Sequence, residues 1–572
     1  MGCPNIQTAV MQPINRRRLL GMAGLAALGS AAVSFPVAAQ ENSKLPVQQF
    51  FNVKDFGATG DGVTLDTAAL NKAIDACNSA GGGTVYLPPG NYLSGTVVLK
   101  SNVTFYLEAG ATLLGSKSIS DYTPQLQMQG PGDVNINATF PQDLRDAGAY
   151  HLIFARDAEN IRLAGMGKIY GPGQAFWAPE KSNKHSDSWK ALPPRPSPML
   201  EFYNCRYLHI QDIRIENSAG WTLRPIHCDN VFIQGISIKN PVYGPNTDGM
   251  DPTCCHNLFI ANCFIDTGDD AICLKSENPY GEELRTSKNI TITNCVLVTR
   301  CNGLKFGTAT HGGYENIVFS NSVIGNGDVP PISGVSIEMV DGGWVEGVVI
   351  SNIRMQRVRT PIFVRRANRH PRPDGTPGTL RGVMIENIHA TGSGLTSSIA
   401  GLPGFDVEDV TLSNIRIDSE ENGKADWVNR DVPEKEKDYP EAHAFGKLPS
   451  YGLYCRHVTG LRLQNLELRP GDSEERPAIF CEDVKNVEIS GLRSQPIQGT
   501  QPVVQLTQTR QALVRDCSAP PTTKTFLEVQ GGQTGPVVVM NNDFSGAENA
   551  IQIGADVPSK AVRTSGNLER QG

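Results

Sequence analysis

The sequence lacks the features of several classes of protein. It contains no long Lys/Arg run, and its formal net charge is −7, which disfavours nucleic acid or an anionic membrane surface as a partner. Beyond residue 39, no run approaches the roughly 20 apolar residues that a membrane span needs. Helix-like segments between the strand-like runs are also lacking, which argues against leucine-rich and ankyrin arrays.

Cysteine is sparse for a chain of this length. Thirteen cysteines are spread over 572 residues, and many lie within strand-like apolar runs, as Cys228, Cys263 and Cys295 do. We interpret most of them as small buried hydrophobic residues rather than as disulfide partners. The pair Cys254-Cys255 has no second Cys/His pair at a suitable spacing. We therefore expect no metal site and no cofactor.

The N-terminal segment has the composition of an export signal. Asn15-Arg16-Arg17-Arg18-Leu19-Leu20 precedes an apolar, Ala/Gly-rich run that extends from Gly21 to about Ala39. Paired arginines before a short, mildly hydrophobic stretch resemble a twin-arginine signal. An ordinary secretory signal and a retained membrane anchor are the alternatives. We expect residues 1–39 to direct export, so that the mature protein is periplasmic or extracellular.

A pattern of paired strand-like runs recurs along the chain. Each copy has a polar residue, apolar-x-apolar, two polar residues and apolar-x-apolar, as in Asn230–Ile238. Alternation by two indicates strands, and a regular period indicates a repeat architecture. Most steps are 25 to 35 residues, whereas 51 residues separate Val410 from Leu461, which indicates an insertion. Equivalent positions in successive copies are Val231, Leu258, Ile290, Ile317, Val348, Val383, Val410, Leu461, Val487, Ala512 and Val537.

The corner between the two runs of a copy is small or polar. Examples are Ala261-Asn262, Ser320-Asn321, Ser351-Asn352 and Ser413-Asn414, which suit a bend with stacked asparagine side chains. A β-propeller is the rival architecture, but its blades need four strands per roughly 40 residues. The pattern therefore predicts an all-β fold, a right-handed single-stranded parallel β-helix.

The ends and the insertion complete the predicted domain organisation. A repeat array needs a cap, and Thr67–Cys77 has helical spacing with Asp66 as a candidate N-cap. We expect an N-terminal cap and first strands over 49–115, the β-helix over 116–545 and a C-terminal tail over 546–572. The insertion at about 420–450 is either a solvated loop or a lobe that shapes one end of a groove.

Three aspartates stand about one repeat apart. Asp269-Asp270 follow Asp248 by 21 and 22 residues. Neighbouring strands of a sheet are about 4.8 Å apart, so these residues should be neighbours on successive coils. Carboxylates crowded on one face are unfavourable unless they serve chemistry. Hydrolysis of a glycosidic bond needs such a group, an acid for the leaving oxygen and a base for water.

Several motifs resemble those of a known family. The most specific are Trp221–Leu223, Asn246–Asp251 and Gly268–Ser276, and Phe51–Ala58 and Gly81–Gly90 resemble the start of its bacterial members. Together they resemble glycoside hydrolase family 28, the polygalacturonase and rhamnogalacturonase family. The N-terminal motifs are shared with pectate-lyase-like β-helices and support only the fold, whereas the two Asp motifs in order support the family.

The resemblance implies inverting hydrolysis of an α-galacturonosyl linkage in a pectic polysaccharide or oligosaccharide, without a metal. By position, Asp269 would protonate the glycosidic oxygen, and Asp248 and Asp270 would hold and deprotonate the attacking water. Lys275 would bind a uronate carboxylate or a hydroxyl, unless it is an ordinary exposed lysine. Asn246 would orient Asp248 or contact the sugar.

Two departures from the family pattern affect the expected substrate. Asn302 replaces the histidine of a Gly-His-Gly motif, and His311 follows in the next turn. Ser336 and Glu338 replace the cations of an Arg-Ile-Lys motif that grips a galacturonate carboxylate. We expect Asn302, Ser336 and Glu338 to face the substrate, where Glu338 would repel a uronate and favour neutral sugar hydroxyls. His311 would reach back to the substrate or be an ordinary loop histidine. Trp344 would stack on a sugar or lie buried in a turn.

We therefore expect a single-domain, monomeric hydrolase that prefers rhamnogalacturonan-type or exo-acting cleavage over endo-polygalacturonase action. One alternative is a pectate or rhamnogalacturonan lyase on the same fold, which would need calcium-binding carboxylates and an Arg or Lys base. The other is a non-catalytic polysaccharide-binding β-helix.

Overall fold

The computed structural model of the protein describes residues 49–126, 149–181, 188–281, 283–325 and 327–570. These residues belong to one compact unit that begins at Gln48, and the predicted export signal lies outside them. Among the described residues, the helices are too short or too polar to span a bilayer.

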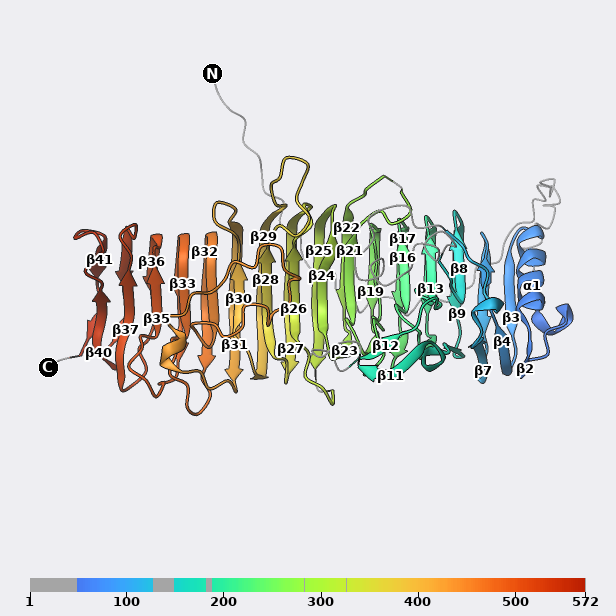
Figure 1. Cartoon of the computed structure of the whole chain (residues 1–572), viewed down its shortest axis with the longest axis horizontal. Coiled ribbons are helices and arrows are strands. Elements are labelled where there is room, and N and C mark those ends of the chain that lie inside the picture. The colour runs from blue at the N-terminus through green and yellow to red at the C-terminus, as the bar shows by residue number, and fades with distance from the viewer. Residues whose placement is uncertain (1–48, 127–148, 182–187, 282, 326, 571–572) are drawn as a thin grey trace, which may run out of the picture. The chain divides into compact units, whose positions relative to one another are not determined.

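Successive strands stack in parallel to form a β-helix, with one coil following another along a single axis (Figure 1). Each coil contributes to three parallel ladders, because the chain returns to the same ladder once per repeat. From β25 onward, some strands continue from the first ladder into the second. The predicted fold class is confirmed.

The first ladder carries the repeated positions. It consists of β1 (Phe50–Asn52), β3 (Gly83–Leu87), β6 (Val103–Leu107), β9 (Glu159–Ala164), β14 (Arg206–Gln211), β17 (Asp229–Gln234), β19 (His256–Ala261), β22 (Ser287–Thr293), β25 (Gly313–Gly325), β27 (Trp344–Gln356), β29 (Thr379–Ser393), β31 (Val407–Ser419), β32 (Leu453–Arg469), β33 (Ile479–Ser490), β36 (Arg510–Arg515), β38 (Val537–Met540) and β41 (Val562–Ser565).

The second ladder forms the next side of the coil. Its separate strands are β2 (Asp61–Leu65), β4 (Gly90–Ser94), β7 (Ala111–Gly115), β10 (Lys168–Tyr170), β15 (Arg214–Glu216), β18 (Ser237–Lys239), β20 (Phe264–Thr267), β23 (Val296–Thr299), β34 (Arg493–Ser494), β39 (Asp543–Phe544) and β42 (Leu568–Glu569).

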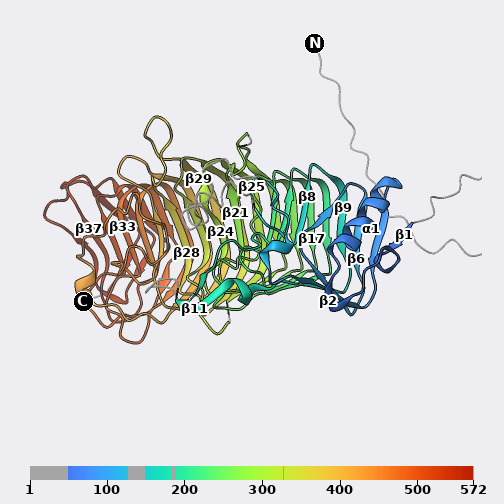
Figure 2. The same ribbon diagram turned by 45° about the vertical axis from the view of Figure 1, so that its right-hand side comes forward.

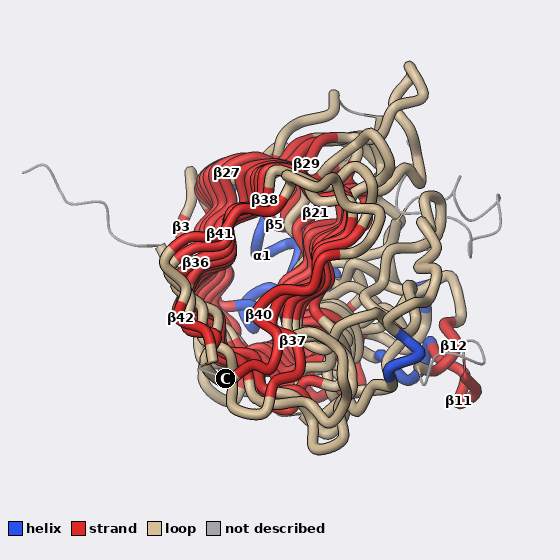
Figure 3. Tube along the Cα trace, turned by 90° about the vertical axis from the view of Figure 1, so that its left-hand side faces the viewer, coloured by secondary structure: helices blue, strands red, loops and turns tan. Residues whose placement is uncertain are grey.

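The third ladder positions the candidate site. Figure 2 shows β21, β24 and β28 in nearby coils of this ladder, and Figure 3 shows long connections gathered beside β21, β37 and β40. The ladder consists of β5 (Val97–Leu99), β8 (Ile153–Arg156), β13 (Leu200–Tyr203), β16 (Leu223–Ile226), β21 (Ile272–Ser276), β24 (Asn302–Thr310), β26 (Ser333–Met339), β28 (Thr360–Arg366), β30 (Ser397–Ala400), β35 (Val504–Thr507), β37 (Thr523–Gln530) and β40 (Ala547–Ile553).

The pairing register matches the period of the sequence. Val231 pairs with Leu258, and Leu258 pairs with Ile290. The same relation continues to Val537 without a slip, across the 51-residue step from Val410 to Leu461. These side chains are buried, and each Val, Leu or Ile among them contributes roughly 1.5–3 kcal/mol by leaving water. Because a slip of one residue would expose every one of them, the apolar pattern fixes the register.

Asparagines stack at the corners, as the sequence predicts. Asn352 donates from Nδ2 to Asn321 Oδ1 at 3.0 Å and accepts from Asn387 Nδ2 at 3.0 Å. Its φ of 58° lies in the left-handed region, which asparagine tolerates better than most residues. The corner therefore depends on both the side-chain amide and the backbone conformation.

We expect Asn352→Ala to lower the free energy of unfolding by about 1–3 kcal/mol, because it removes two ladder hydrogen bonds and strains the left-handed backbone. Asn352→Gly should lose the hydrogen bonds without the strain and be less destabilised. Thermal unfolding of the three proteins checks this order. An alanine variant as stable as wild type would contradict the role of the ladder.

The predicted N-terminal helix is α1 (Thr67–Ser79), which buries Leu70, Ile74 and Cys77 and lies at the N-terminal end of the coils (Figure 1). Asp66 precedes it but does not cap it. The Asp66 carboxylate instead accepts hydrogen bonds from the backbone N–H groups of Thr59 (2.7 Å) and Gly60 (2.9 Å). Asp66 therefore stabilises the preceding loop. The short 3-10 helices are η1 (Val53–Phe56), η2 (Ile119–Asp121), η3 (Gly173–Phe176) and η4 (Ala425–Trp427).

The insertion between β31 and β32 is packed rather than freely solvated. Its Val428, Phe445 and Leu448 form a second hydrophobic cluster with Phe363 of β28. A separate antiparallel pair, β11 (Trp177–Lys181) and β12 (Trp189–Ala191), projects beside the coils (Figure 3). Where a C-terminal tail was predicted, the chain continues the β-helix, because β40 and β41 pair in parallel with β37 and β38.

The cysteines in the described ranges are free thiols, and all except Cys301 are buried. Cys228, Cys255 and Cys263 lie in the main hydrophobic core. The interpretation of most cysteines as small core residues is confirmed.

Candidate active site

The three aspartates come together on the third ladder. Met250 bridges to Ile272 in parallel, so Asp248 and Asp270 occupy equivalent positions on adjacent coils. The backbone N–H of Gly249 donates to the carbonyl of Asp270 at 2.9 Å, so the two segments that carry the aspartates are directly hydrogen-bonded. The neighbour relation predicted from the 22-residue step is therefore present.

The aspartates line a pocket of ≈170 Å³. Asp248 and Asp270 are each only 4% exposed, and Asp269 is half-buried. Such burial places the carboxyl groups at the bottom of a recess rather than on an open surface. The lining residues are Trp221, Asn246, Asp248, Asp269, Asp270, Lys275, Cys301, Lys305, Tyr439 and Glu441.

Asp270 is held as a carboxylate. Its Oδ1 accepts hydrogen bonds from the backbone N–H (3.0 Å) and the side-chain amide (2.7 Å) of Asn302, and its Oδ2 lies 3.3 Å from Lys305 Nζ. Burial raises the pKa of Asp270, but the Lys305 charge and the Asn302 hydrogen bonds outweigh burial and lower the pKa overall. Asp270 is therefore ionised under mildly acidic conditions.

The other two carboxyl groups bind protons more readily. Burial, followed by repulsion from Asp270, raises the pKa of Asp269 to about 6. Burial, followed by repulsion from Asp251 and Asp269, raises the pKa of Asp248 well above its usual range. Within the described part of the chain, Asp248 Oδ1 has no hydrogen-bond partner. The cluster thus combines an ionised carboxylate with two protonatable groups.

Asn246 is fixed by a residue that sequence reasoning missed. Arg195 donates from Nη2 to Asn246 Oδ1 at 3.1 Å and from Nη1 to the carbonyls of Ala219 (2.7 Å) and Pro245 (2.9 Å). Burial lowers the pKa of Arg195 to about 10, so Arg195 stays cationic at neutral pH. Its charge is attracted to the carboxyl group of Asp248. Arg195 precedes the Asp motifs by about two coils, and no spacing signal points to it.

Lys275 lies in the pocket, as expected, although it is only 2% exposed. Its Nζ is 4.4 Å from the centroid of the Trp221 ring and 3.6 Å from Asp251 Oδ1. Burial raises the pKa of Asp251 to about 8, against the opposing charge of Lys275. Lys275 and Trp221 together form one wall of the pocket.

Lys305 was also missed, and it connects four segments of the protein. Its Nζ lies 3.3 Å from Asp270 Oδ2, 3.6 Å from Glu338 Oε2 and 3.7 Å from Glu441 Oε1. It also donates to the Tyr439 hydroxyl at 3.3 Å. Tyr439 and Glu441 belong to the insertion, so the insertion forms part of the pocket wall. Of the two interpretations of this segment, the lobe beside the groove is the one that the geometry fits.

Three residues expected to face the substrate are instead buried behind the pocket. Asn302, Ser336 and Glu338 are all 0% exposed. Asn302 hydrogen-bonds Asp270, and the Ser336 hydroxyl donates to Glu338 Oε1 at 2.5 Å. Burial raises the pKa of Glu338 to about 8, in opposition to Lys305. Glu338 therefore does not face a uronate, because its carboxyl group is buried beside Lys305.

His311 and Trp344 also lie away from the pocket lining. The His311 ring stacks on His370 at 5.8 Å, and Asp341 joins them to give ligating atoms within 4.8 Å of one another. Arg369 occupies both oxygens of Asp341, at 2.8 and 2.6 Å, so a cation opposes metal binding there and we assign no metal. The Trp344 indole lies over Gly313, which leaves no room for a side chain at that position.

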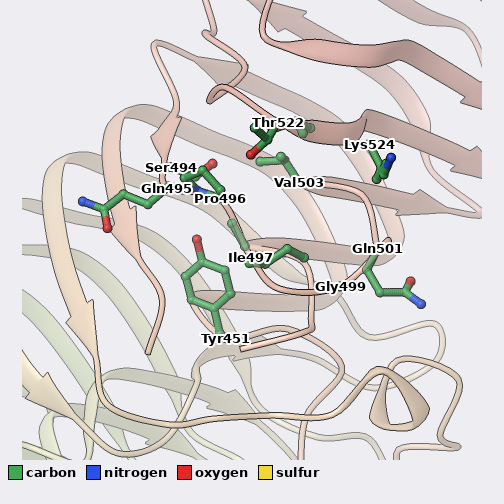
Figure 4. A pocket seen from close by; sticks show the side chains of 12 residues that line it. Tyr451, Ser494, Gln495, Pro496, Ile497, Gly499, Gln501, Val503, Thr522 and Lys524 are labelled. Carbon is green, nitrogen blue, oxygen red and sulfur yellow. The ribbon is translucent and has the colours of Figure 1, made fainter. Parts of the chain in front are cut away.

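A separate hollow near the C-terminal coils does not resemble an active site. Tyr451, Ile497 and Lys524 are among its lining residues (Figure 4), and it holds only ≈20 Å³. No aspartate or glutamate lines it. Acid–base chemistry therefore belongs to the pocket on the third ladder.

Comparisons with known proteins identify the family of the chain. Residues 90–436, more than half of the chain, match the family model described as Glycosyl hydrolases family 28. Residues 50–123 match the model described as Rhamnogalacturonase A/epimerase, pectate lyase-like. A probable polygalacturonase of Vitis vinifera is 28% identical over 398 residues, covering 66% of this chain and 76% of the relative. An exo-poly-alpha-D-galacturonosidase of Dickeya chrysanthemi is 25% identical over 418 residues, covering 65% of this chain and 68% of the relative.

Solved structures support the fold. An exopolygalacturonase from Thermotoga maritima superposes with a TM-score of 0.53 at 24% identity, covering 65% of this chain and 88% of that structure. A family 28 exopolygalacturonase from Yersinia enterocolitica gives a TM-score of 0.51 at 20% identity, covering 79% of this chain and 76% of that structure. With its matching family model, its parallel β-helix and its cluster of aspartates, the chain belongs to glycoside hydrolase family 28 and is a glycoside hydrolase.

Proposed function

We propose that the protein is an exo-acting hydrolase of α-galacturonosyl linkages in galacturonan or its oligomers, with inversion at the anomeric carbon. The observation that carries this proposal is the deep burial of Asp248 and Asp270 in a pocket whose wall includes the insertion residues Tyr439 and Glu441. A recess of this kind accepts the end of a chain, whereas an endo-acting enzyme needs an open cleft through which a chain passes.

In the proposed reaction, Asp269 protonates the glycosidic oxygen as the bond to the anomeric carbon breaks. Asp270, ionised by its contacts with Lys305 and Asn302, takes a proton from the attacking water. Asp248, with Oδ1 unpaired within the described residues, holds that water. Lys275 and Trp221 contact the sugar, because an amphipathic ring and a cation suit a uronate.

The family and the cations in and beside the pocket support an acidic substrate. Relatives are named polygalacturonase and exo-poly-alpha-D-galacturonosidase. Lys275, Lys305 and Arg195 lie in or beside the pocket and favour an acidic sugar. With Glu338 covered, no lining residue specifically favours rhamnose, so we place homogalacturonan oligomers before rhamnogalacturonan.

Product profiling tests the proposal directly. The protein should release monomeric galacturonate from chain ends of oligogalacturonates, and NMR at early times should show the β-anomer from an α-linked substrate. A mixture of internal fragments would contradict the exo mode, and a retained α-anomer would contradict inversion. Unsaturated products that absorb in the ultraviolet, with activity sensitive to EDTA, would instead indicate a lyase.

The pKa shifts predict an acidic pH optimum. The general acid Asp269 must be protonated, and its pKa is raised to about 6, so kcat/KM should fall as pH rises above about 6. Asp270 must be ionised, and its lowered pKa keeps it ionised at pH values where an ordinary carboxyl group binds a proton. Rate profiles on oligogalacturonates, with stability verified at each pH, check this. A profile that still rises at about pH 7 would exclude Asp269 as the acid.

We also propose that the mature protein is exported and meets its substrate in the periplasm or outside the cell. The support is the arginine-led apolar segment at residues 16–39, and pectic polymers lie outside the cytoplasm.

A further inference from the structure

A second depression lies beside the active-site pocket. It is lined by two arginines, a histidine and a largely apolar floor, has a volume of ≈630 Å³ and includes no aspartate or glutamate. We call it the arginine depression. Its lining residues are Arg300, Val329, Ile332, Arg359, Gly394, Leu395 and His443.

The register places this depression next to the catalytic carboxyl groups. Arg300 directly precedes Cys301, which lines the active-site pocket. Asn302 pairs with Ser333, and Ser333 pairs with Thr360, so Cys301, Ile332 and Arg359 occupy equivalent positions on three successive coils. Two coil steps correspond to roughly 10 Å. A chain of a few sugar units that starts in the pocket can therefore reach Arg359.

The two arginines carry charge that the described residues do not neutralise. Arg300 donates only to the carbonyl of Val242 at 3.4 Å, and within the described ranges neither Arg300 nor Arg359 forms an ion pair with a carboxylate. Other outward arginines of this β-helix do pair with an acid of a neighbouring coil, as Arg381 does with Glu346 (2.9 Å) and Arg515 with Glu488 (2.7 Å).

The floor and the rim suit a saccharide. Ile332 and Leu395 offer apolar surface for the C–H face of a sugar ring, and Ile332 packs against the hydrophobic cluster of the insertion. His443 comes from the same insertion as the pocket residues Tyr439 and Glu441. The insertion thus borders both recesses, so one ligand that occupies both can contact neighbouring residues of the insertion.

We propose that the arginine depression is a distal subsite for an acidic sugar unit of the same substrate chain, in which Arg300 and Arg359 bind a uronate carboxylate. This inference rests on the proposed function, and it adds a dependence on chain length. Oligomers long enough to reach the depression gain two charge-assisted contacts, and shorter ones gain none.

The test compares Arg300→Gln/Arg359→Gln with Arg381→Gln/Arg515→Gln, a control that removes the same charge elsewhere. With long oligogalacturonates, the first variant should raise KM about tenfold and weaken its dependence on salt. With digalacturonate and with methyl-esterified oligomers, it should match wild type. The control variant should match wild type on all substrates.

A binding measurement separates this inference from the proposed function. Calorimetric titration of long oligogalacturonates into Asp269→Asn, with and without the two arginine substitutions, should show the same tenfold difference in affinity. If wild type hydrolyses no galacturonan but this difference remains, the proposed function fails and the subsite stands. If wild type is active and the arginine variant behaves like the control, the subsite is overturned.

Discussion

Asp269→Asn lowers kcat on oligogalacturonates by about 10²–10⁴, the usual contribution of a general acid. The reason is that an amide can hydrogen-bond the glycosidic oxygen but cannot transfer a proton to it. Asp269 is suited to the role because its pKa is raised to about 6 by burial and by Asp270, so that it is protonated where Asp270 is already ionised. Initial rates at saturating substrate measure the effect.

A substrate that needs no acid separates the roles of the two aspartates. An aryl galacturonide with a good leaving group departs without protonation, so Asp269→Asn should recover most of its rate on this substrate. Asp270→Asn should stay inactive, because activation of water is still required. Asp266→Asn is the matched control, since Asp266 lies three residues earlier on the second ladder and should retain full activity. If Asp270→Asn is rescued and Asp269→Asn is not, the two roles are reversed.

The sequence predicts the coil and the position of the aspartates because both depend on a local period. Apolar alternation determines which face of each strand is buried, and the repeat length determines which residues pair. The pairs that link Val231 to Leu258 and Leu258 to Ile290 follow directly from that phase. The closeness of Asp248 and Asp270 follows from the same arithmetic, with no knowledge of the surrounding side chains.

The other residues in and around the pocket could not be predicted from the period. Arg195, Tyr439 and Glu441 belong to connections outside the coil, whose paths depend on packing such as that of Phe445 against Phe363. The residues of a connection do not follow the repeat period, so the sequence does not show which coil they lie against.

One missed feature did leave a signal in the sequence. Lys305 interrupts an apolar strand, and it pairs in register with Ser336 on the next coil. Glu338 lies two residues beyond Ser336. Side chains two residues apart share a face of a strand. The opposite charges of Lys305 and Glu338 could therefore have been matched across the coils. That match would have placed Glu338 against the lysine instead of the sugar.

Lys305→Met should have the second largest effect, and it acts on both stability and rate. Lys305 is 1% exposed and faces Asp270, Glu338 and Glu441, so its removal leaves buried acids without a counter-charge, which costs about 3–5 kcal/mol. These acids respond by binding protons, since Lys305 opposes the rise of their pKa values. An acid whose pKa is higher in the folded than in the unfolded state stabilises the fold at low pH, and this stabilisation is lost as pH rises through the folded-state pKa. Relative to wild type, the deficit should therefore be smallest at low pH, where these acids are protonated in both proteins, and should grow as pH rises. Asp270 contributes above its lowered wild-type pKa, and Glu338 contributes only above about pH 8, where it ionises in wild type.

The rate of Lys305→Met should change in a way that general destabilisation cannot reproduce. Without the cation, the pKa values of Asp270 and Asp269 both rise, so both limbs of the kcat/KM profile move to higher pH. Lys305→Met/Glu338→Gln is the informative partner, because it removes one uncompensated buried acid. It should regain about 1–3 kcal/mol of stability, yet keep the shifted profile, since Asp270 still lacks its counter-charge. Recovery of the wild-type profile together with the stability would show that Lys305 acts on Asp270 only through packing.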